Sequence, residues 1–111
     1  MTRALKITAV GRTRMVEVES FGDYEREVGG FVSTISLCDD HVLVFNGAAT
    51  NDGYRNDLAI AAVAHLGSDT NKKAVIRGTV LVVRVEESGS WDDIHDTIDR
   101  EICGLAALLR Y

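Results

Sequence analysis

Residues 75–85 form the longest β-type segment of the chain and constrain its fold more than any other feature. Aliphatic residues occupy both alternating sets of positions, among them Val75, Leu81, Val82 and Val85. A strand that is apolar on both sides has to be covered on both sides, because either face would otherwise leave apolar surface in water. The segment therefore predicts the central strand of a sheet.

Two antiparallel hairpins are predicted upstream of this strand. Residues 5–10 and 15–19 alternate apolar and polar side chains and are separated by the turn Gly11-Arg12-Thr13. Residues 31–37 and 41–45 form a second pair, separated by Cys38-Asp39-Asp40. Short connections between such segments are typical of hairpins. With the central strand they predict a mostly antiparallel, five-stranded sheet.

Three helices are predicted beside the sheet. Residues 21–28 are a short amphipathic segment that Gly29-Gly30 ends, and residues 56–66 are alanine-rich and apolar on almost every side, which indicates a buried helix. Ser90 and Asp93 resemble a capping box at the start of a long C-terminal amphipathic helix. Its apolar stripe, which predicts packing on the sheet, is Ile94, Ile98, Ile102, Leu105 and Leu109. The predicted fold is a single α+β domain over residues 1–111.

Composition and charge restrict the partners of this domain. Of its 111 residues 46% are hydrophobic and 26% are charged, which is typical of a globular protein. The net charge of −5 and the scattered basic residues argue against direct binding of nucleic acid or of a membrane surface. The start of the chain lacks the apolar run of a signal peptide, and Cys38 and Cys103 are expected to be buried free thiols. We therefore expect a cytoplasmic protein.

No catalytic or metal-binding constellation is visible in the sequence. His41, His65 and His95 lack a second ligand at a metal-binding spacing. His95 and Asp99 are four residues apart and predict a surface pair on the last helix, because no nucleophile is near them. A glycine-rich phosphate loop is also missing. We expect no enzymatic activity, no metal and no cofactor.

The segment from Glu86 to Glu101 contains seven carboxylates and one basic residue, Arg100. On the predicted last helix, Asp92, Asp96 and Asp99 share one face away from the isoleucine stripe. A solvated outer face with favourable helix-dipole charges is one interpretation. The other is a negative patch that docks a basic surface, as an anti-defence or DNA-mimic protein would use.

The stretch from residue 46 to residue 56 is the candidate recognition loop, because hydrogen-bonding side chains are densest there. One hypothesis is that it binds a small ligand such as a nucleotide; the other is a structural loop in which Asn56 or Asp57 caps the next helix. The candidate ligand-binding residues are Asn46, Asn51, Asp52, Tyr54, Arg55 and Asn56.

The end of the last helix is more apolar than a one-sided stripe requires, which predicts a homodimer. The residues concerned are Ala106, Ala107, Leu108, Leu109 and Tyr111.

Four stretches carry a resemblance to a known family. They are Val28-Gly29-Gly30-Phe31-Val32, then Val42-Leu43-Val44-Phe45-Asn46 after the Asp39-Asp40 turn, then Tyr54-Arg55-Asn56 with Leu58-Ala59, and Ile76-Arg77-Gly78-Thr79-Val80-Leu81-Val82-Val83. In these stretches the chain resembles the bacterial, phage and plasmid-borne proteins known as domain of unknown function 3846. The family often has a proline shortly before the asparagine that matches Asn56, and this chain has none. The resemblance implies an accessory protein of a mobile element, with no activity or catalytic residue to transfer. We therefore expect a non-enzymatic protein that binds another protein.

Overall fold

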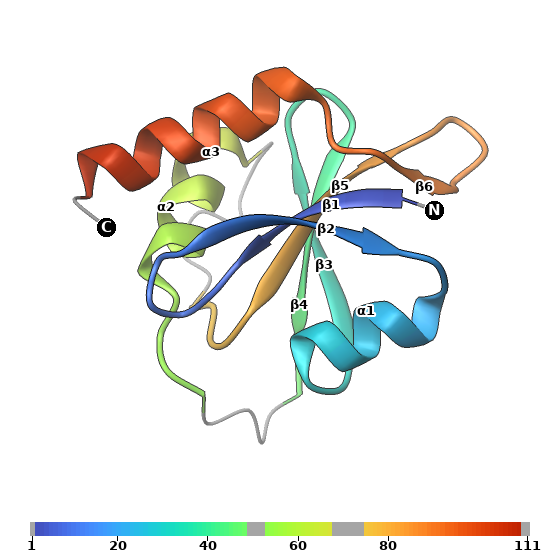
Figure 1. Ribbon diagram of the computed structural model, residues 1–111, viewed down its shortest axis with the longest axis horizontal. Coiled ribbons are helices and arrows are strands. Elements are labelled where there is room, and N and C mark those ends of the chain that lie inside the picture. Colours follow the sequence, from blue (N-terminus) through green and yellow to red (C-terminus); the bar gives the residue numbers. More distant parts are fainter. Residues whose placement is uncertain (1, 49–52, 68–74, 110–111) are drawn as a thin grey trace.

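The computed structural model describes residues 2–48, 53–67 and 75–109, which form an antiparallel sheet with helices on both sides (Figure 1). The α+β prediction is confirmed. No helix in these ranges is long and apolar enough to cross a bilayer. The elements are β1 (Thr2–Ile7), β2 (Thr13–Val18), α1 (Phe21–Val28), β3 (Val32–Leu37), β4 (His41–Asn46), α2 (Asp57–Leu66), β5 (Val80–Val85), β6 (Trp91–Asp92) and α3 (Asp96–Leu108).

The late strand β5 lies in the middle of the sheet, whose order is β2-β1-β5-β4-β3. The two predicted hairpins, β1–β2 and β3–β4, lie on either side of it, and all the pairings are antiparallel. Strand β1 pairs with residues 80–82 of β5, and the short β6 pairs with residues 84 and 85. Strand β6 therefore pairs with β5 beyond the point where the pairing of β5 with β1 stops.

The two faces of β5 belong to two cores. Val80 and Val82 pack with α2 and α3, whereas Leu81 and Val83 pack with Tyr24 and Val28 of α1. Figure 1 shows α2 and α3 on one side of the sheet and α1 on the other. Each fully buried aliphatic side chain stabilises the fold by about 1.5–3 kcal/mol. The prediction of a central strand covered on both sides is confirmed.

The first two helices have the ends that their sequences predict. At the start of α1, the Asp23 carboxylate accepts hydrogen bonds from the N–H groups of Glu19 and Ser20, at 2.9 and 3.2 Å. At its end Gly29 has φ +83°, a left-handed conformation that glycine adopts without strain. At the start of α2, Asn56 Oδ1 accepts a hydrogen bond from the Ala59 N–H at 3.0 Å.

The prediction that the central strand begins at Val75 is wrong, because β5 begins at Val80. Gly78 has φ +78°, which interrupts an extended strand. Its N–H donates to the Tyr54 carbonyl at 2.8 Å, and the Ile76 carbonyl accepts from the Asn56 N–H at 2.8 Å. The backbone before β5 therefore binds the segment that leads into α2.

The predicted start of the last helix is also wrong. Helix α3 begins at Asp96 with His95 as its N-cap, whereas Asp92 lies on β6. Asp93 Oδ1 accepts from the Arg3 N–H at 2.7 Å, and this bond fixes the chain between β6 and α3. The expected His95–Asp99 pair gives way to a cap, in which His95 Nδ1 accepts from the Thr97 N–H at 3.2 Å. The local sequence pattern placed Asp92 at the start of the helix, but Asp92 pairs with β5 instead.

Candidate functional site

An open hollow of about 370 Å³ lies between the start of α1 and the β5–β6 hairpin. We call it the aromatic hollow. It collects the first residue of β1, the end of β2, the first turn of α1 and the start of β6, so the fold brings together segments from both ends of the chain. Its lining residues are Thr2, Val18, Glu19, Ser20, Phe21, Tyr24, Gly89, Ser90 and Trp91.

Three aromatic rings form the apolar part of this hollow. The centroid of the Trp91 ring lies 4.7 Å from that of Tyr24, with the rings nearly perpendicular at 84°. The centroid of the Phe21 ring lies 6.3 Å from that of Trp91, at 38°. Tyr24 is buried, Trp91 is half-buried and Phe21 is 59% exposed. The outer two rings therefore offer aromatic surface to a ligand.

Strand geometry explains why Trp91 faces α1. Trp91 is paired with Val85, and Asp92 is paired with Arg84. Successive side chains of a strand point to opposite faces of the sheet. The indole therefore lies on the α1 side of the sheet, among the residues of the smaller core, while Asp92 and Arg84 lie on the other side.

The Tyr24 hydroxyl is a buried polar group that makes no hydrogen bond within the part of the chain that the structure describes. Burial raises the pKa of Tyr24, and the nearby Thr2 hydroxyl opposes this shift. A buried hydroxyl without a partner is uncommon in folded proteins. Tyr24 lines the aromatic hollow, but its hydroxyl oxygen is covered by the protein and lies near Thr2.

The carboxylates near the aromatic hollow differ in their availability. Backbone hydrogen bonds from Glu19 and then Ser20, with a smaller contribution from Arg26, lower the pKa of Asp23 and commit it to the helix start. The Glu19 side chain is exposed and has no ion pair among the described residues. Aromatic faces and a free carboxylate both attract cations. The arrangement thus suits a positively charged group.

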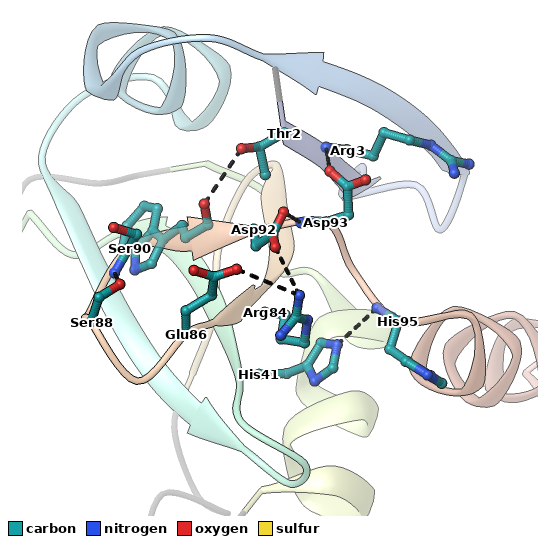
Figure 2. Close-up of polar contacts among 11 residues, drawn as sticks. Thr2, Arg3, His41, Arg84, Glu86, Ser88, Ser90, Asp92, Asp93 and His95 are labelled. Atoms are coloured by element: carbon teal, nitrogen blue, oxygen red, sulfur yellow. Dashed lines mark hydrogen bonds and ion pairs between the residues drawn. The ribbon is translucent and has the colours of Figure 1, made fainter.

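On the opposite side of the sheet, charged side chains of the β5–β6 hairpin form ion pairs with one another. Arg84 Nη2 lies 2.8 Å from Asp92 Oδ2 and 3.9 Å from Glu86 Oε1, and Figure 2 shows both carboxylates directed at Arg84. The side-chain hydrogen bond between the two acids raises the pKa of Glu86 and lowers that of Asp92. These groups satisfy one another and join the two strands of the hairpin.

His41 lies beside this cluster and contacts the start of α3 (Figure 2). It is only 2% exposed, and its Nε2 accepts from the His95 N–H at 3.0 Å. Its Nδ1 lies 2.7 Å from the Asp39 carbonyl and therefore carries the proton. Burial lowers the pKa of His41; the hydrogen bond with the Asp39 carbonyl opposes this shift, and the nearby His95 and Arg84 add to it. Nothing in the sequence indicates this contact between residues 41 and 95.

The described residues of the candidate recognition loop differ in their burial. Asn56 is fully buried, and its Nδ2 donates to the carbonyls of Ile7 and Gly78, at 3.1 and 2.8 Å. These bonds engage its amide within the fold, and its alternative role as a helix cap is confirmed.

Among the other residues of this loop, Tyr54 and Arg55 are adjacent, and Asn46 lines a groove with Arg77, whose Nη1 donates to the Gly53 carbonyl at 3.1 Å. Asn46 Nδ2 donates to the Gly29 carbonyl at 3.3 Å, Arg55 Nε lies 2.9 Å from Asp57 Oδ1, and Tyr54 is exposed. Asn51 and Asp52 lie outside the described residues.

The predicted acidic face is divided between two elements. Asp92 lies on β6 and is bound to Arg84, while Asp96 and Asp99 lie in the first turn of α3. Asp99 Oδ1 accepts a hydrogen bond from the Cys103 thiol at 3.5 Å. The prediction that the three aspartates share one helix face is therefore wrong.

The described residues contain no cluster of three or more His, Cys, Asp or Glu side chains that could hold a metal ion. Both cysteines are free, as expected, but Cys103 is exposed where burial was predicted. Partial burial raises the pKa of the Cys103 thiol, so it is not an activated thiolate.

Comparisons with protein-family models, with curated proteins and with solved structures gave no match to this chain.

Proposed function

We propose that this protein is a non-enzymatic accessory protein of phage, prophage or plasmid type that acts by binding another protein. The observation that carries this proposal is the aromatic hollow, where the exposed Phe21 and the half-buried Trp91 lie near Glu19, whose carboxylate has no ion pair among the described residues. The mobile-element context comes from the sequence resemblance. Free Cys38 and Cys103 support a reducing compartment, which in our proposal is the cytoplasm.

The aromatic hollow favours a basic segment of the partner. An arginine side chain can stack its guanidinium on Trp91 or Phe21 and donate hydrogen bonds to the Glu19 carboxylate. Such cation–π contacts contribute about 0.5–2 kcal/mol each. The net charge of −5 adds a longer-range attraction that accelerates encounter with a basic partner.

The two rival functions have weaker support. A DNA mimic would need a continuous row of free carboxylates, but Asp92 is already bound to Arg84. A nucleotide site at residues 46–56 would need side chains that converge, but Asn56 is fully buried. A nucleotide that raised the unfolding temperature of the protein would favour the nucleotide function over ours.

The test uses the intrinsic fluorescence of Trp91, the only tryptophan of the chain, as a reporter inside the aromatic hollow. The probe is an acetylated and amidated peptide with four Gly-Arg repeats. The matched control peptide carries citrulline, which has nearly the same shape as arginine without its charge. We expect a saturable change in fluorescence with the arginine peptide and at least a several-fold weaker response with the citrulline peptide. Equal responses, or none, would overturn the proposal.

A pair of variants separates the aromatic hollow from general acidity. Glu19→Gln removes the carboxylate of a residue that lines the aromatic hollow, whereas Glu25→Gln removes the carboxylate of an exposed α1 residue that is not among its lining residues. We expect Glu19→Gln to weaken peptide binding a few-fold and Glu25→Gln to leave it nearly unchanged. Equal losses in the two variants would show that binding follows the net charge and not the aromatic hollow.

A further inference from the structure

The solvent-facing side of the α2–α3 layer is apolar to a degree that a monomer does not require. Helix α2 presents Ile60, Ala61 and Ala64, which line an open groove together with Leu109. Leu105 and Leu108 of α3 line the adjoining groove. Leu108 is 78% exposed. We call these six residues the helix-pair patch. An exposed apolar patch of this kind marks an interaction surface.

Charged residues of both signs lie around the helix-pair patch. At the N-terminal end of α2, Arg55 Nε lies 2.9 Å from Asp57 Oδ1. At the C-terminal end of α2, His65 Nε2 lies 3.5 Å from Glu101 Oε2, and Arg100 lies beside them. Among the described residues, two arginines and two carboxylates thus border the patch, and with neutral histidine their formal charges sum to zero. The chain as a whole carries −5, and two copies repel each other over most other surfaces.

We propose that two copies of this chain associate through the helix-pair patch around a two-fold axis. An isologous interface requires a surface that is complementary to itself. When the two α2 helices lie antiparallel, the N-terminal end of each faces the C-terminal end of the other. Asp57 of one copy then lies opposite Arg100 of the other, and Leu108 is covered. This interface lies on the opposite side of the sheet from the aromatic hollow and is independent of the proposed partner binding.

The test measures mass in solution by sedimentation and light scattering, from 5 to 200 µM protein. We expect the wild-type chain to approach twice the monomer mass as the concentration rises. Leu108→Glu should hold the chain at the monomer mass, because two carboxylates would be buried in an apolar contact. Val10→Glu is the matched control, since Val10 is 67% exposed in the turn between β1 and β2 and should leave the association intact. Circular dichroism establishes that each variant is folded.

Charge exchange tests the two-fold arrangement itself. Arg100→Glu should weaken the association at least several-fold, because it sets two carboxylates opposite each other at both ends of the interface. The double variant Arg100→Glu with Asp57→Arg restores the pairing and should recover the association. A wild-type monomer throughout the concentration range, or a dimer that persists in Leu108→Glu, would overturn the proposed surface. Failure of the double variant to recover would overturn the antiparallel arrangement.

Discussion

His41 is a buried imidazole whose two nitrogens are both engaged. Nδ1–H donates to the Asp39 carbonyl, and Nε2 accepts from the His95 N–H, so the neutral ring fits the fold and the charged ring does not. Protonation of Nε2 would leave two donors facing each other at the N-cap of α3. The hydrogen bond between His41 and the His95 N–H therefore makes the packing of α3 on the sheet dependent on pH.

We expect the free energy of unfolding to fall as the pH falls below about 6.5. Burial lowers the pKa of His41 in the folded state from its usual value of 6.5. Between the folded pKa and 6.5 the unfolded chain binds more protons, so acidification favours unfolding in that window; above 6.5 the stabilising contribution is fully present. Urea unfolding at pH 7.5 and at pH 5.5 measures this difference.

Two variants assign the pH effect to its residue. His41→Gln should lower stability at both pH values, because it disturbs both hydrogen bonds, and should reduce the loss between them. His65→Gln changes an exposed histidine and should keep the loss found in the wild-type protein. An undiminished pH dependence in His41→Gln would contradict the assignment.

Neither His41 nor the aromatic residues of the hollow could have been identified as a group from the sequence. Phe21, Tyr24 and Trp91 meet only because β6 pairs with β5 beside the first turn of α1. Spacing patterns report neighbours within one element and do not report contacts across about 70 residues. Asn56 was recognisable as a helix cap, because capping depends on residues a few positions away.

Helix α2 depends on Asn56 for more than its first turn. The Asn56 side chain caps α2, and it also binds the carbonyls that end β1 and precede β5. The Asn56 side-chain amide thus links the start of α2 to the end of β1 and to the segment that precedes β5. The bond to the Ile7 carbonyl is buried and the bond to the Gly78 carbonyl is partly buried, so water cannot replace them freely.

We expect Asn56→Ala to lower the free energy of unfolding by about 2–4 kcal/mol. Loss of the cap contributes about 1 kcal/mol, and each carbonyl left without a partner contributes about 1 kcal/mol or more. The adjacent exposed variant Arg55→Ala serves as the control and should change stability by less than about 0.5 kcal/mol. Urea unfolding at pH 7.5 measures both, and comparable losses in the two variants would refute the structural role of Asn56.

The sequence predicted elements well where their signals were local. Helix α1 has the predicted bounds, because its capping aspartate and terminal glycine lie within the helix or next to it. The start of β5 was predicted too early, because Gly78 bends the chain toward the segment before α2. The start of α3 was also predicted too early, because Trp91 and Asp92 pair with β5. Both errors arise from partners that are distant in sequence.

The whole molecule presents its two proposed binding surfaces on opposite sides of one sheet. A dimer through the helix-pair patch leaves both aromatic hollows open, so it would offer two sites to a partner. A partner with repeated basic segments could then bind both sites, with an apparent affinity above that of one site.

We expect salt to separate the two interactions. Binding of the arginine peptide should weaken a few-fold between 50 and 500 mM NaCl, because exposed charges are screened over about 10 Å at 0.1 M salt. Self-association should change less, because it buries mainly apolar residues of the helix-pair patch. Fluorescence titration and sedimentation in the same buffers measure the two effects. A peptide affinity that is independent of salt would contradict the ionic basis of the proposed recognition.

The central position of β5 also sets an order of events during synthesis. Both hairpins are translated before β5. At about 5–20 residues per second, synthesis of the segment between β4 and β5 takes on the order of seconds. During that interval β1 and β4 each have an edge that only β5 will occupy, and unpaired strand edges invite pairing with other chains. Contacts such as Leu5 with Val82 are far apart in sequence, which slows folding further. The nascent chain is therefore more prone to aggregation than the finished protein, and it depends on the late arrival of a single strand.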